Sequence, residues 1–347
     1  MLRRSVLRGL AAWLALPMLF AANAVRADDV RISGPVVHDN LAIYFVHGAS
    51  AGGPVPLTLA EALAAGSVRV DETGNVNQLA IENLGRHAVF VQAGDIVKGG
   101  QQDRVLMVSL VLPPHSGRLP IASFCVEQGR WSARGAEDVR RFASAGTSVP
   151  SREAKIAMQA PPAPGHTPTA GLMADTGVRQ QQVWDNVSKI QRKLERNVGA
   201  PVASPQSQTS LQLALENEKL AAARAAYITA LQVAGEREDD IVGYVFAING
   251  KLNSADLYPS NSLFRKMWPK LVAANANEAI GERNEASGAP PSIEMVTAFL
   301  DTSRLGAPSE KDLTGAVRQQ TRASDSEIFL ETRRGDDAWV HRRYLAK

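Results

Sequence analysis

The sequence predicts an α+β fold in which strands dominate the first half of the chain and helices enter in the second. Short apolar or alternating runs, separated by Gly, Pro, Asn and Asp, fill residues 28–131, which is typical of hairpins in a mixed or antiparallel sheet. Beyond residue 176 the apolar residues recur at helical spacing, and two more hairpin patterns follow. Strands first, then helices mixed with strands, favour α+β over a doubly wound parallel sheet.

Composition narrows the class of protein further. The chain has 347 residues, of which 45% are apolar and 21% are charged, and it contains one Cys. This apolar content is enough for a packed core and excludes wholesale disorder. A single Cys excludes a disulfide scaffold and any multi-thiolate metal or iron–sulfur site.

The first 27 residues resemble an export signal. Arg3, Arg4 and Arg8 precede an apolar stretch over residues 10–22, and small residues lie just before Asp28. The stretch is short for a membrane span, so cleavage is favoured over a retained N-terminal anchor. The pattern fits the Sec route and the twin-arginine route, and we expect a periplasmic or secreted protein with no stable membrane span after cleavage.

Removal of the signal changes the charge argument. The whole chain has 38 Lys and Arg against 35 Asp and Glu, a formal net charge of +3. Four of the bases and none of the acids lie in residues 1–27, so the mature chain has 34 bases against 35 acids, a net charge of −1. Nucleic acid is therefore not an expected partner.

The β-rich half is expected to span residues 28–143. A short helix is predicted from Thr58, its cap, to Gly66, where it stops. The strand-like runs around it are Val36–Val46, Ser67–Asp71, Gln78–Asn83, Ala88–Gln92, Val105–Leu112 and Pro120–Glu127.

The second half begins after a segment rich in Pro, Ala and Gly. Residues 144–176 are predicted to form a flexible loop, because they can bury too little apolar surface to offset their ordering entropy. Residues 177–285 are predicted to hold a helical hairpin (183–198 and 211–231), a hairpin at Asn249-Gly250 and a further helix. Residues 286–347 are expected to add a helix and a closing hairpin around Gly335.

The most unusual stretch is residues 94–104. The adjacent Gly99 and Gly100 permit positive φ, so that their backbone N–H groups and the side chains of Lys98 and Arg104 are able to converge on an anion. The alternative is a two-residue hairpin turn in which Asp95 faces Arg104 across the ladder and no ligand is needed.

A second stretch runs from Cys125 to Trp131. Arg130 and Trp131 follow the end of a strand, where an Arg and an aromatic ring are suited to grip an anionic or planar group. No His lies nearby to activate Cys125, so we expect a buried thiol there. Glu127 is either a general base or the partner of an arginine.

The third stretch is the turn before Asp256, where Asn253 is presented from a rigid frame. Six His residues show no metal-ligand spacing, and no nucleotide or nucleophile-elbow motif is present. The sequence therefore predicts neither a metal site nor a cofactor.

Taken together, these stretches resemble a known family. The resemblance is carried by Ala93–Arg104, Leu112-Pro113-Pro114, Phe124–Trp131, Val242–Asp256 and Leu263–Leu271. They are similar to the ARPP domain family, named for its association with ADP-ribosylglycohydrolases and with rhodanese/phosphatase-superfamily proteins, over residues 35–285. The association points to nucleotide or ADP-ribose chemistry, and the family supplies no catalytic residue to carry over.

Two functions follow as hypotheses. The first is a site that binds, or as a hydrolase cleaves, an anionic small molecule such as a phosphorylated or nucleotide-like compound; the general base would be Glu127, Asp95 or Asp103. Its binding residues would be Lys98, Gly99, Gly100, Gln101, Arg104, Arg130, Trp131 and Asn253. The second is a non-enzymatic envelope module that docks a protein partner, of no identified kind, through its helical half.

Overall fold

Three sheets and a long helix between them build the part of the chain that the computed structural model describes. The described residues are 30–130, 132, 134, 137, 139–159, 168–284, 288–314, 317–335 and 338–347. Residues 31–347 cluster into one unit. The predicted export signal lies outside the described residues.

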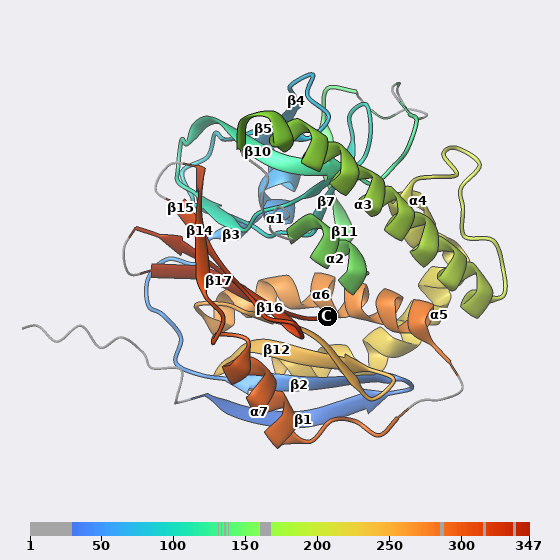
Figure 1. Cartoon of the computed structure of the whole chain (residues 1–347), viewed down its shortest axis with the longest axis vertical. Helices are drawn as coiled ribbons and strands as arrows, with labels where there is room; N and C mark the ends of the chain where they lie inside the picture. Colours follow the sequence, from blue (N-terminus) through green and yellow to red (C-terminus); the bar gives the residue numbers. More distant parts are fainter. Residues whose placement is uncertain are drawn as a thin grey trace, which may run out of the picture. The chain divides into compact units, whose positions relative to one another are not determined.

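The largest sheet is antiparallel and has eight strands in the order β1-β2-β12-β13-β17-β16-β15-β14 (Figure 1). Its strands are β1 (Arg31–His38), β2 (Leu41–His47), β12 (Ile241–Ile248), β13 (Lys251–Leu257), β14 (Pro308–Thr314), β15 (Val317–Ala323), β16 (Glu327–Arg334) and β17 (Ala338–Ala346). The C-terminal strands therefore extend the sheet that the N-terminal hairpin begins, and residues 286–347 are built into the same fold.

Two smaller sheets come from the first half of the chain. One has the order β11-β7-β8-β10-β5-β4, and the other is β3-β6-β9, in which β3 and β6 are parallel. Their strands are β3 (Leu57–Thr58), β4 (Val68–Glu72), β5 (Gln78–Asn83), β6 (Val89–Val91), β7 (Asp95–Gly99), β8 (Arg104–Leu106), β9 (Leu110–Leu112), β10 (Gly117–Cys125) and β11 (Phe142–Ser148). The α+β class with a β-rich first half is thus confirmed.

Local sequence signals account for several boundaries. Helix α1 (Leu59–Ala64) begins with a capping box, because the Thr58 hydroxyl and the Glu61 carboxylate each accept the other residue's backbone N–H. At Asn249-Gly250 both φ angles are positive, 53° and 76°, and the flanking residues pair directly, so the predicted two-residue hairpin turn is confirmed.

Two expected strands are each split in the structure. The run 36–46 turns back at Asp39, whose φ is +52°, and forms the β1–β2 hairpin. The apolar run 105–112 divides between β8 and β9, which belong to different sheets. An unbroken apolar run shows burial but does not show where the chain passes from one sheet to another.

The helices also differ in part from expectation. The second helix of the predicted hairpin is two helices, because Asn217 accepts the N–H groups of Lys219 and Leu220 and so starts a new one. The helices are α2 (Arg152–Gln159), α3 (Pro168–Val198), α4 (Leu211–Leu215), α5 (Glu218–Leu231), the 3₁₀ helix η2 (Gln232–Glu236), α6 (Asn261–Glu282) and α7 (Ile293–Thr302). None of the described helices has the length and apolar character needed to cross a membrane.

Part of the expected flexible loop is regular structure. The end of β11 and all of α2 lie within residues 144–159, and Ala154 and Met158 of α2 are buried in the main core. These apolar residues are few but face one side of a short helix, which composition alone does not reveal. Residues 160–167 lie outside the described part.

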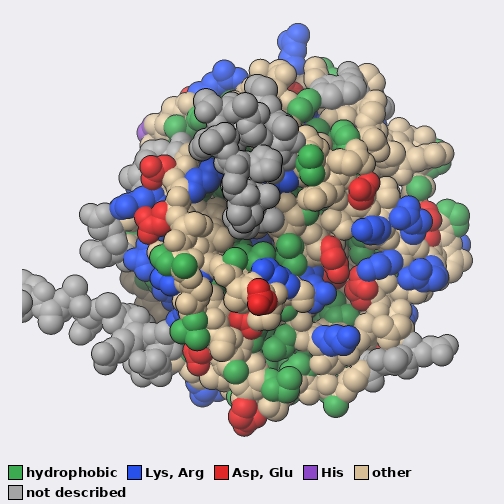
Figure 2. Space-filling model, in the orientation of Figure 1, with side chains coloured by type: hydrophobic (Ala, Val, Ile, Leu, Met, Phe, Trp, Pro, Cys, Tyr) green, Lys and Arg blue, Asp and Glu red, His purple; other side chains and the backbone are tan. Residues whose placement is uncertain are grey.

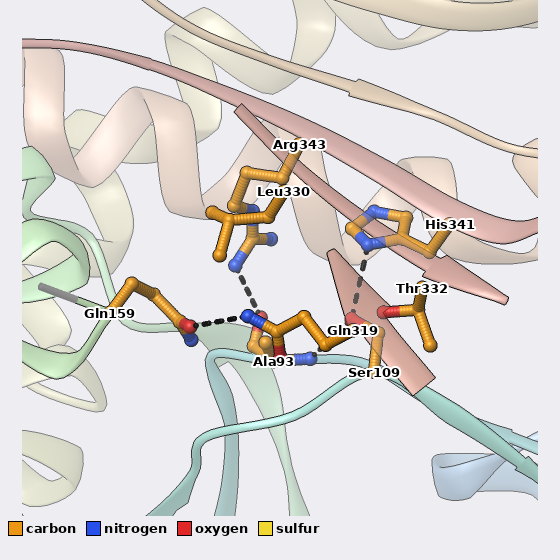
Figure 3. A pocket seen from close by; sticks show the side chains of 8 residues that line it. All are labelled: Ala93, Ser109, Gln159, Gln319, Leu330, Thr332, His341 and Arg343. Atoms are coloured by element: carbon orange, nitrogen blue, oxygen red, sulfur yellow. Dashed lines mark hydrogen bonds between the residues drawn. The ribbon is translucent and has the colours of Figure 1, made fainter. Parts of the chain in front are cut away.

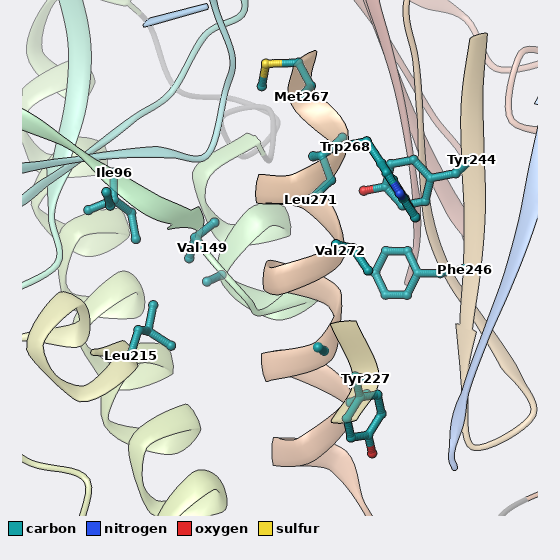
Figure 4. Close-up of a cluster of buried hydrophobic side chains, with 14 of the residues drawn as sticks. Ile96, Val149, Leu215, Tyr227, Tyr244, Phe246, Met267, Trp268, Leu271 and Val272 are labelled. Atoms are coloured by element: carbon teal, nitrogen blue, oxygen red, sulfur yellow. The ribbon is translucent and has the colours of Figure 1, made fainter. Parts of the chain in front are cut away.

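Helix α6 is the centre of the core. In Figure 4, Trp268 and Val272 point toward Tyr244 and Phe246 of β12, whereas Ile96, Val149 and Leu215 lie on the other side of the helix. Apolar residues of α7 pack with buried residues of β2 and β12 in a separate cluster. Because both faces of the large sheet are covered here, every residue of β2 and β12 is buried.

Candidate functional site

Residues 100–103 form a loop between β7, which ends at Gly99, and β8. Val97, not Asp95, lies opposite Arg104 in the ladder, so the predicted two-residue turn at Gly99-Gly100 is wrong. The loop leaves backbone N–H groups unpaired within the ladder, as an anion-binding loop would.

Protein acceptors take these N–H groups. The amide of Gly99 donates to the Asp103 carboxylate at 3.0 Å, and the amide of Gln101 donates to Glu72 at 3.1 Å. Two carboxylates therefore hold the positions at which the loop would present donors to an anion.

The paired glycines serve close packing with β11. Both have positive φ, 116° and 57°. A Cβ on Gly99 would lie 2.6 Å from the carbonyl oxygen of Arg141, and a Cβ on Gly100 would lie 2.3 Å from the Phe142 ring. Only glycine fits at either position.

A buried ion cluster fastens this loop to the segment after β10. Asp103 and Glu127 have no exposed surface, and the Arg134 guanidinium lies 2.8 Å from Asp103 and 3.3 Å from Glu127. Asp103 also accepts the hydroxyl of Ser210, the N-cap of α4, at 2.9 Å. These carboxylates have several charged or polar partners each, as buried charges require.

Arg130 belongs to the same cluster. Its Nε lies 2.8 Å from Glu127, and its Nη groups donate to the carbonyls of Gly99 at 3.2 Å and Gly100 at 3.1 Å. The two predicted segments therefore do meet, with the guanidinium directed at acids and carbonyls of the protein itself.

The remaining cations of the loop are paired in the same way. Arg104 is fully buried and lies 3.3 Å from Glu72, and Lys98 lies 2.7 Å from Glu216. Among the described residues, the ion pairs of this cluster join four bases, Lys98, Arg104, Arg130 and Arg134, with five acids, Glu72, Asp103, Glu127, Glu137 and Glu216. With no excess of positive charge, this cluster does not favour an anion.

Three other predicted site residues lie apart from the cluster or outside the description. Asp95 is buried and bound at 2.6 Å by Lys270 of α6. Asn253 donates to the buried Glu278 at 2.9 Å, on the α6 side of the β12–β13 hairpin. Trp131 lies outside the described residues.

Cys125 is buried, as the sequence predicted. Burial raises the pKa of its thiol to about 11, and Arg104 nearby only partly opposes that rise. The thiol is protonated at neutral pH, which is the opposite of what a nucleophilic cysteine needs.

A second buried network joins residues far apart in the sequence. In Figure 3 the Ser109 hydroxyl meets Nδ1 of His341, at 3.0 Å, and Nε2 of His341 lies 3.1 Å from Asp256. Arg343 donates to Asp256 at 2.7 Å and to the carbonyl of Ala93 at 2.7 Å. No sequence motif predicts this order of Ser, His and Asp.

The cavity beside this network is too small for a substrate. Its volume is about 10 Å³, which suits one water molecule. Ser109 also accepts the N–H of Ala93 at 2.9 Å, and its exposed fraction is 3%. The network ties the residue before β9 to β13 and β17 and has no room for acyl-transfer chemistry in this arrangement.

One region large enough for a ligand lies between α2, α3, the end of α6 and the β12–β13 hairpin, and we name it the α2–hairpin groove. It consists of two hollows of about 360 and 230 Å³ that share Glu153 and Glu282. The larger volume falls within the range of small-molecule sites. Asn253 lines this groove, so one predicted binding residue lies here. Another hollow, of about 540 Å³, lies beside Lys98, where the acids Glu137 and Glu216 also line it.

Basic residues from three elements line the α2–hairpin groove. They are Arg152 of α2, Lys189 and Lys193 of α3 and Lys251 of β13, and the carboxylates are Glu153, Glu278 and Glu282. The buried Lys155 lies 3.5 Å from Glu278 and adds a further positive charge behind the wall. Over the two hollows together, the described lining residues hold four bases and three carboxylates, so positive charge is in excess there, unlike in the loop cluster.

Two of these lysines, Lys189 and Lys251, are exposed. Lys193 is paired with Glu282, and Arg152 lies 3.6 Å from Glu153. Lys189 and Lys251 have no side-chain hydrogen bond or ion pair within the described part of the chain. On the face seen in Figure 2, basic and acidic side chains gather over the region of α2, α3 and α6.

One feature of the sequence indicates part of this groove, although it lies outside the predicted site residues. Lys189 and Lys193 are four residues apart on a predicted helix, so they share a face. Lys251 lies in the hairpin next to Asn253 but could not be joined to α3 without knowing how the helices pack.

Comparison with known proteins places the chain in a family. It matches no curated protein and no solved structure. The family model of ARPP-1, the ARG and Rhodanese-Phosphatase-superfamily-associated Protein domain, matches residues 29–345, so the similarity reaches beyond the expected 35–285 and takes in the C-terminal strands. The chain belongs to the ARPP-1 domain family.

Proposed function

We propose that this protein binds an anionic small molecule, such as a phosphorylated or nucleotide-like compound, in the α2–hairpin groove. The observation that carries the proposal is the excess of basic side chains over the two adjoining hollows taken together, with the exposed Lys251 lining the hollow of about 360 Å³ and the exposed Lys189 lining the hollow of about 230 Å³. Ammonium groups are suited to phosphate and carboxylate as point charges.

The walls of the groove are rigid, which favours binding. Glu278 accepts the backbone N–H of Arg152 at 2.8 Å and the amide of Asn253 at 2.9 Å, so α2, α6 and the hairpin are fixed to one another. A site whose walls are already ordered loses little conformational entropy when a ligand binds.

The loop residues first considered for this role have a different place in the proposal. Lys98, Arg104 and Arg130 hold the fold together through their carboxylate partners. The general bases considered for hydrolysis, Asp95, Asp103 and Glu127, are occupied likewise, so the proposal is for binding and assigns no catalytic base.

Thermal-shift measurements with inorganic phosphate, glucose 6-phosphate, a sugar acid and ADP test the proposal. A ligand at 100 times its Kd stabilises the native state by about 2.7 kcal/mol, which raises Tm measurably. We expect a rise with at least one phosphorylated compound, and loss of that rise in the double variant Lys189→Gln, Lys251→Gln. Lys219→Gln, an exposed lysine on α5, is the control and should keep it. No rise with any probe, or an equal rise in the double variant, would contradict the proposal.

We also propose that residues 1–27 direct export. Protein recovered from the periplasm of an expressing bacterium should then begin at Asp28, as shown by amino-terminal sequencing or intact mass. Recovery of the full-length chain from the cytoplasm alone would contradict this.

The docking alternative has less support. Exposed large apolar residues of the helical half include Val178, Val233 and Met295, and they lie on three separate elements. Single exposed apolar side chains are ordinary on protein surfaces.

A further inference from the structure

Another polar cluster, separate from the loop cluster and from the His341 network, lies at the opposite end of β12 from the α2–hairpin groove. It consists of His47 at the end of β2, Glu238 and Asp240 just before β12, and Arg31 and Ser33 of β1. His47 pairs with Ile241 on one side and with Arg31 on the other, so the sheet register brings the cluster together.

The donor set is one that transition metals prefer. Nδ1 of His47 lies 2.7 Å from Asp240 and 3.7 Å from Glu238, and the three ligand atoms lie within 4.8 Å of one another. Atoms bound to Zn²⁺ at about 2.0–2.2 Å in a tetrahedron are about 3.4 Å apart. One nitrogen with two carboxylates therefore has the spacing of three ligands around one ion.

Nδ1 of His47 lies between a donor and an acceptor. The ring is 98% buried, and its Nδ1 lies 3.0 Å from an Nη of Arg31 as well as 2.7 Å from the Asp240 carboxylate. Toward Arg31 this nitrogen must accept, and toward Asp240 it must donate, and a single ring nitrogen cannot do both. A cation in the place of the guanidinium satisfies Nδ1 and both carboxylates at once.

The other ring nitrogen is held as a metal ligand requires. Nε2 lies 2.7 Å from the Ser33 hydroxyl, which can accept a hydrogen bond from Nε2–H. In that tautomer the free lone pair of the ring is on Nδ1. The backbone of the acidic segment is fixed too: the Asp240 carbonyl accepts the N–H of Gly48 at 2.9 Å, and the Glu238 carbonyl accepts the amide of Asn261 at 3.2 Å.

From this geometry we propose that His47, Glu238 and Asp240 bind a divalent transition-metal ion, with Zn²⁺ as the probe of choice. Arg31 has a 57% exposed side chain and competes with the ion for the same carboxylates. The nitrogen ligand and the small number of oxygens favour Zn²⁺ over Mg²⁺ or Ca²⁺. No sequence motif marks this site, because His47 lies about 190 residues before its two acidic partners.

Titration of chelator-treated full chain with Zn²⁺, followed by competition against a chromophoric zinc indicator, tests the site. We expect one ion per chain, unaffected by an equal concentration of Mg²⁺. Glu238→Gln and Asp240→Asn should each weaken binding at least about tenfold, and Ser33→Ala by about 10–100-fold, as for other residues that orient a ligand. Arg31→Gln should strengthen binding, because it removes the competing cation.

The matched control is Asp239→Asn. Asp239 lies between Glu238 and Asp240 in the sequence and pairs instead with Arg265. The control variant should bind Zn²⁺ like the wild type. Absence of stoichiometric binding, equal affinity in Asp240→Asn and Asp239→Asn, or weaker binding in Arg31→Gln would each overturn the assignment. Circular dichroism of every variant shows that a loss of binding is not a loss of folding.

Discussion

Asp103→Asn is expected to lower the free energy of unfolding by about 3–5 kcal/mol, the usual cost of removing one partner from a buried ion pair. The side chain has no exposed surface, and its carboxylate binds Arg134, Ser210 and the amide of Gly99. The substitution keeps the shape but leaves the Arg134 charge without its main partner.

Urea unfolding followed by circular dichroism measures this loss, with Asp239→Asn as the control. Asp239 is 92% exposed in its ion pair, and such pairs contribute about 0.2–1 kcal/mol at most. If Asp103→Asn were as stable as Asp239→Asn, the cluster around the Gly99-Gly100 loop would not be a structural one, and the anion-binding interpretation of that loop would regain support.

Arg343→Met is expected to cost a similar amount, about 3–5 kcal/mol, and its cost should depend on pH. Arg343 is buried, donates to the buried Asp256 at 2.7 Å and also holds the carbonyl of Ala93. Burial alone would raise the pKa of Asp256, but the charge of Arg343 and the hydrogen bond of His341 outweigh it and hold this pKa well below its ordinary value.

The sign of the pH dependence follows from that pKa. A carboxyl group whose pKa is lowered in the folded state adds stability above its unfolded pKa, about 3.9, and this stability is lost as the pH falls through that value toward the folded pKa. Without Arg343, burial raises the pKa of Asp256, so the variant gains stability relative to the wild type as the pH falls. The difference between the two proteins should therefore be largest near pH 7 and should narrow toward pH 4. Urea unfolding at a series of pH values measures it, and a constant or widening difference would contradict this account of Asp256.

Local signals in the sequence predicted the elements whose boundaries have a local cause. Thr58 caps α1 and Asn249-Gly250 turns the β12–β13 hairpin, and both depend on residues within a few positions. The apolar stripe of α3, which includes Val183 and Leu194, is buried as its spacing indicated. What the sequence left open was which strands share a sheet, because pairing such as that of β13 with β17 joins residues almost 90 positions apart.

The candidate site shows the same limit more sharply. The sequence suggested that Lys98 and Arg104 lie near one another but contained no information on Glu216 and Glu72, whose carboxylates pair with them after folding. A charge is available to a ligand only if the fold leaves it without a partner, and partners come from distant segments. For that reason the motifs indicated an anion, while the place now proposed for it depends on how α2, α3, α6 and the hairpin come together in the fold.

The loop cluster and the α2–hairpin groove differ in charge balance, and we assign them different roles. The ion pairs around the Gly99-Gly100 loop hold the six-stranded sheet against α4, because the five acids and four bases there pair with one another. The α2–hairpin groove, which has basic residues in excess, is the part proposed to recognise a ligand.

One comparison of affinities tests most directly whether the ligand binds in the α2–hairpin groove and not at the Gly99-Gly100 loop. Isothermal titration with glucose 6-phosphate is made on the wild type, on Lys251→Gln in the groove and on Lys98→Gln in the loop. A charge-assisted hydrogen bond contributes about 1.5–3 kcal/mol, so Lys251→Gln should weaken binding by about 10–100-fold, whereas Lys98→Gln should bind as the wild type does. If Lys98→Gln weakened binding and Lys251→Gln left it unchanged, the ligand would bind at the Gly99-Gly100 loop, and the proposed site would be contradicted.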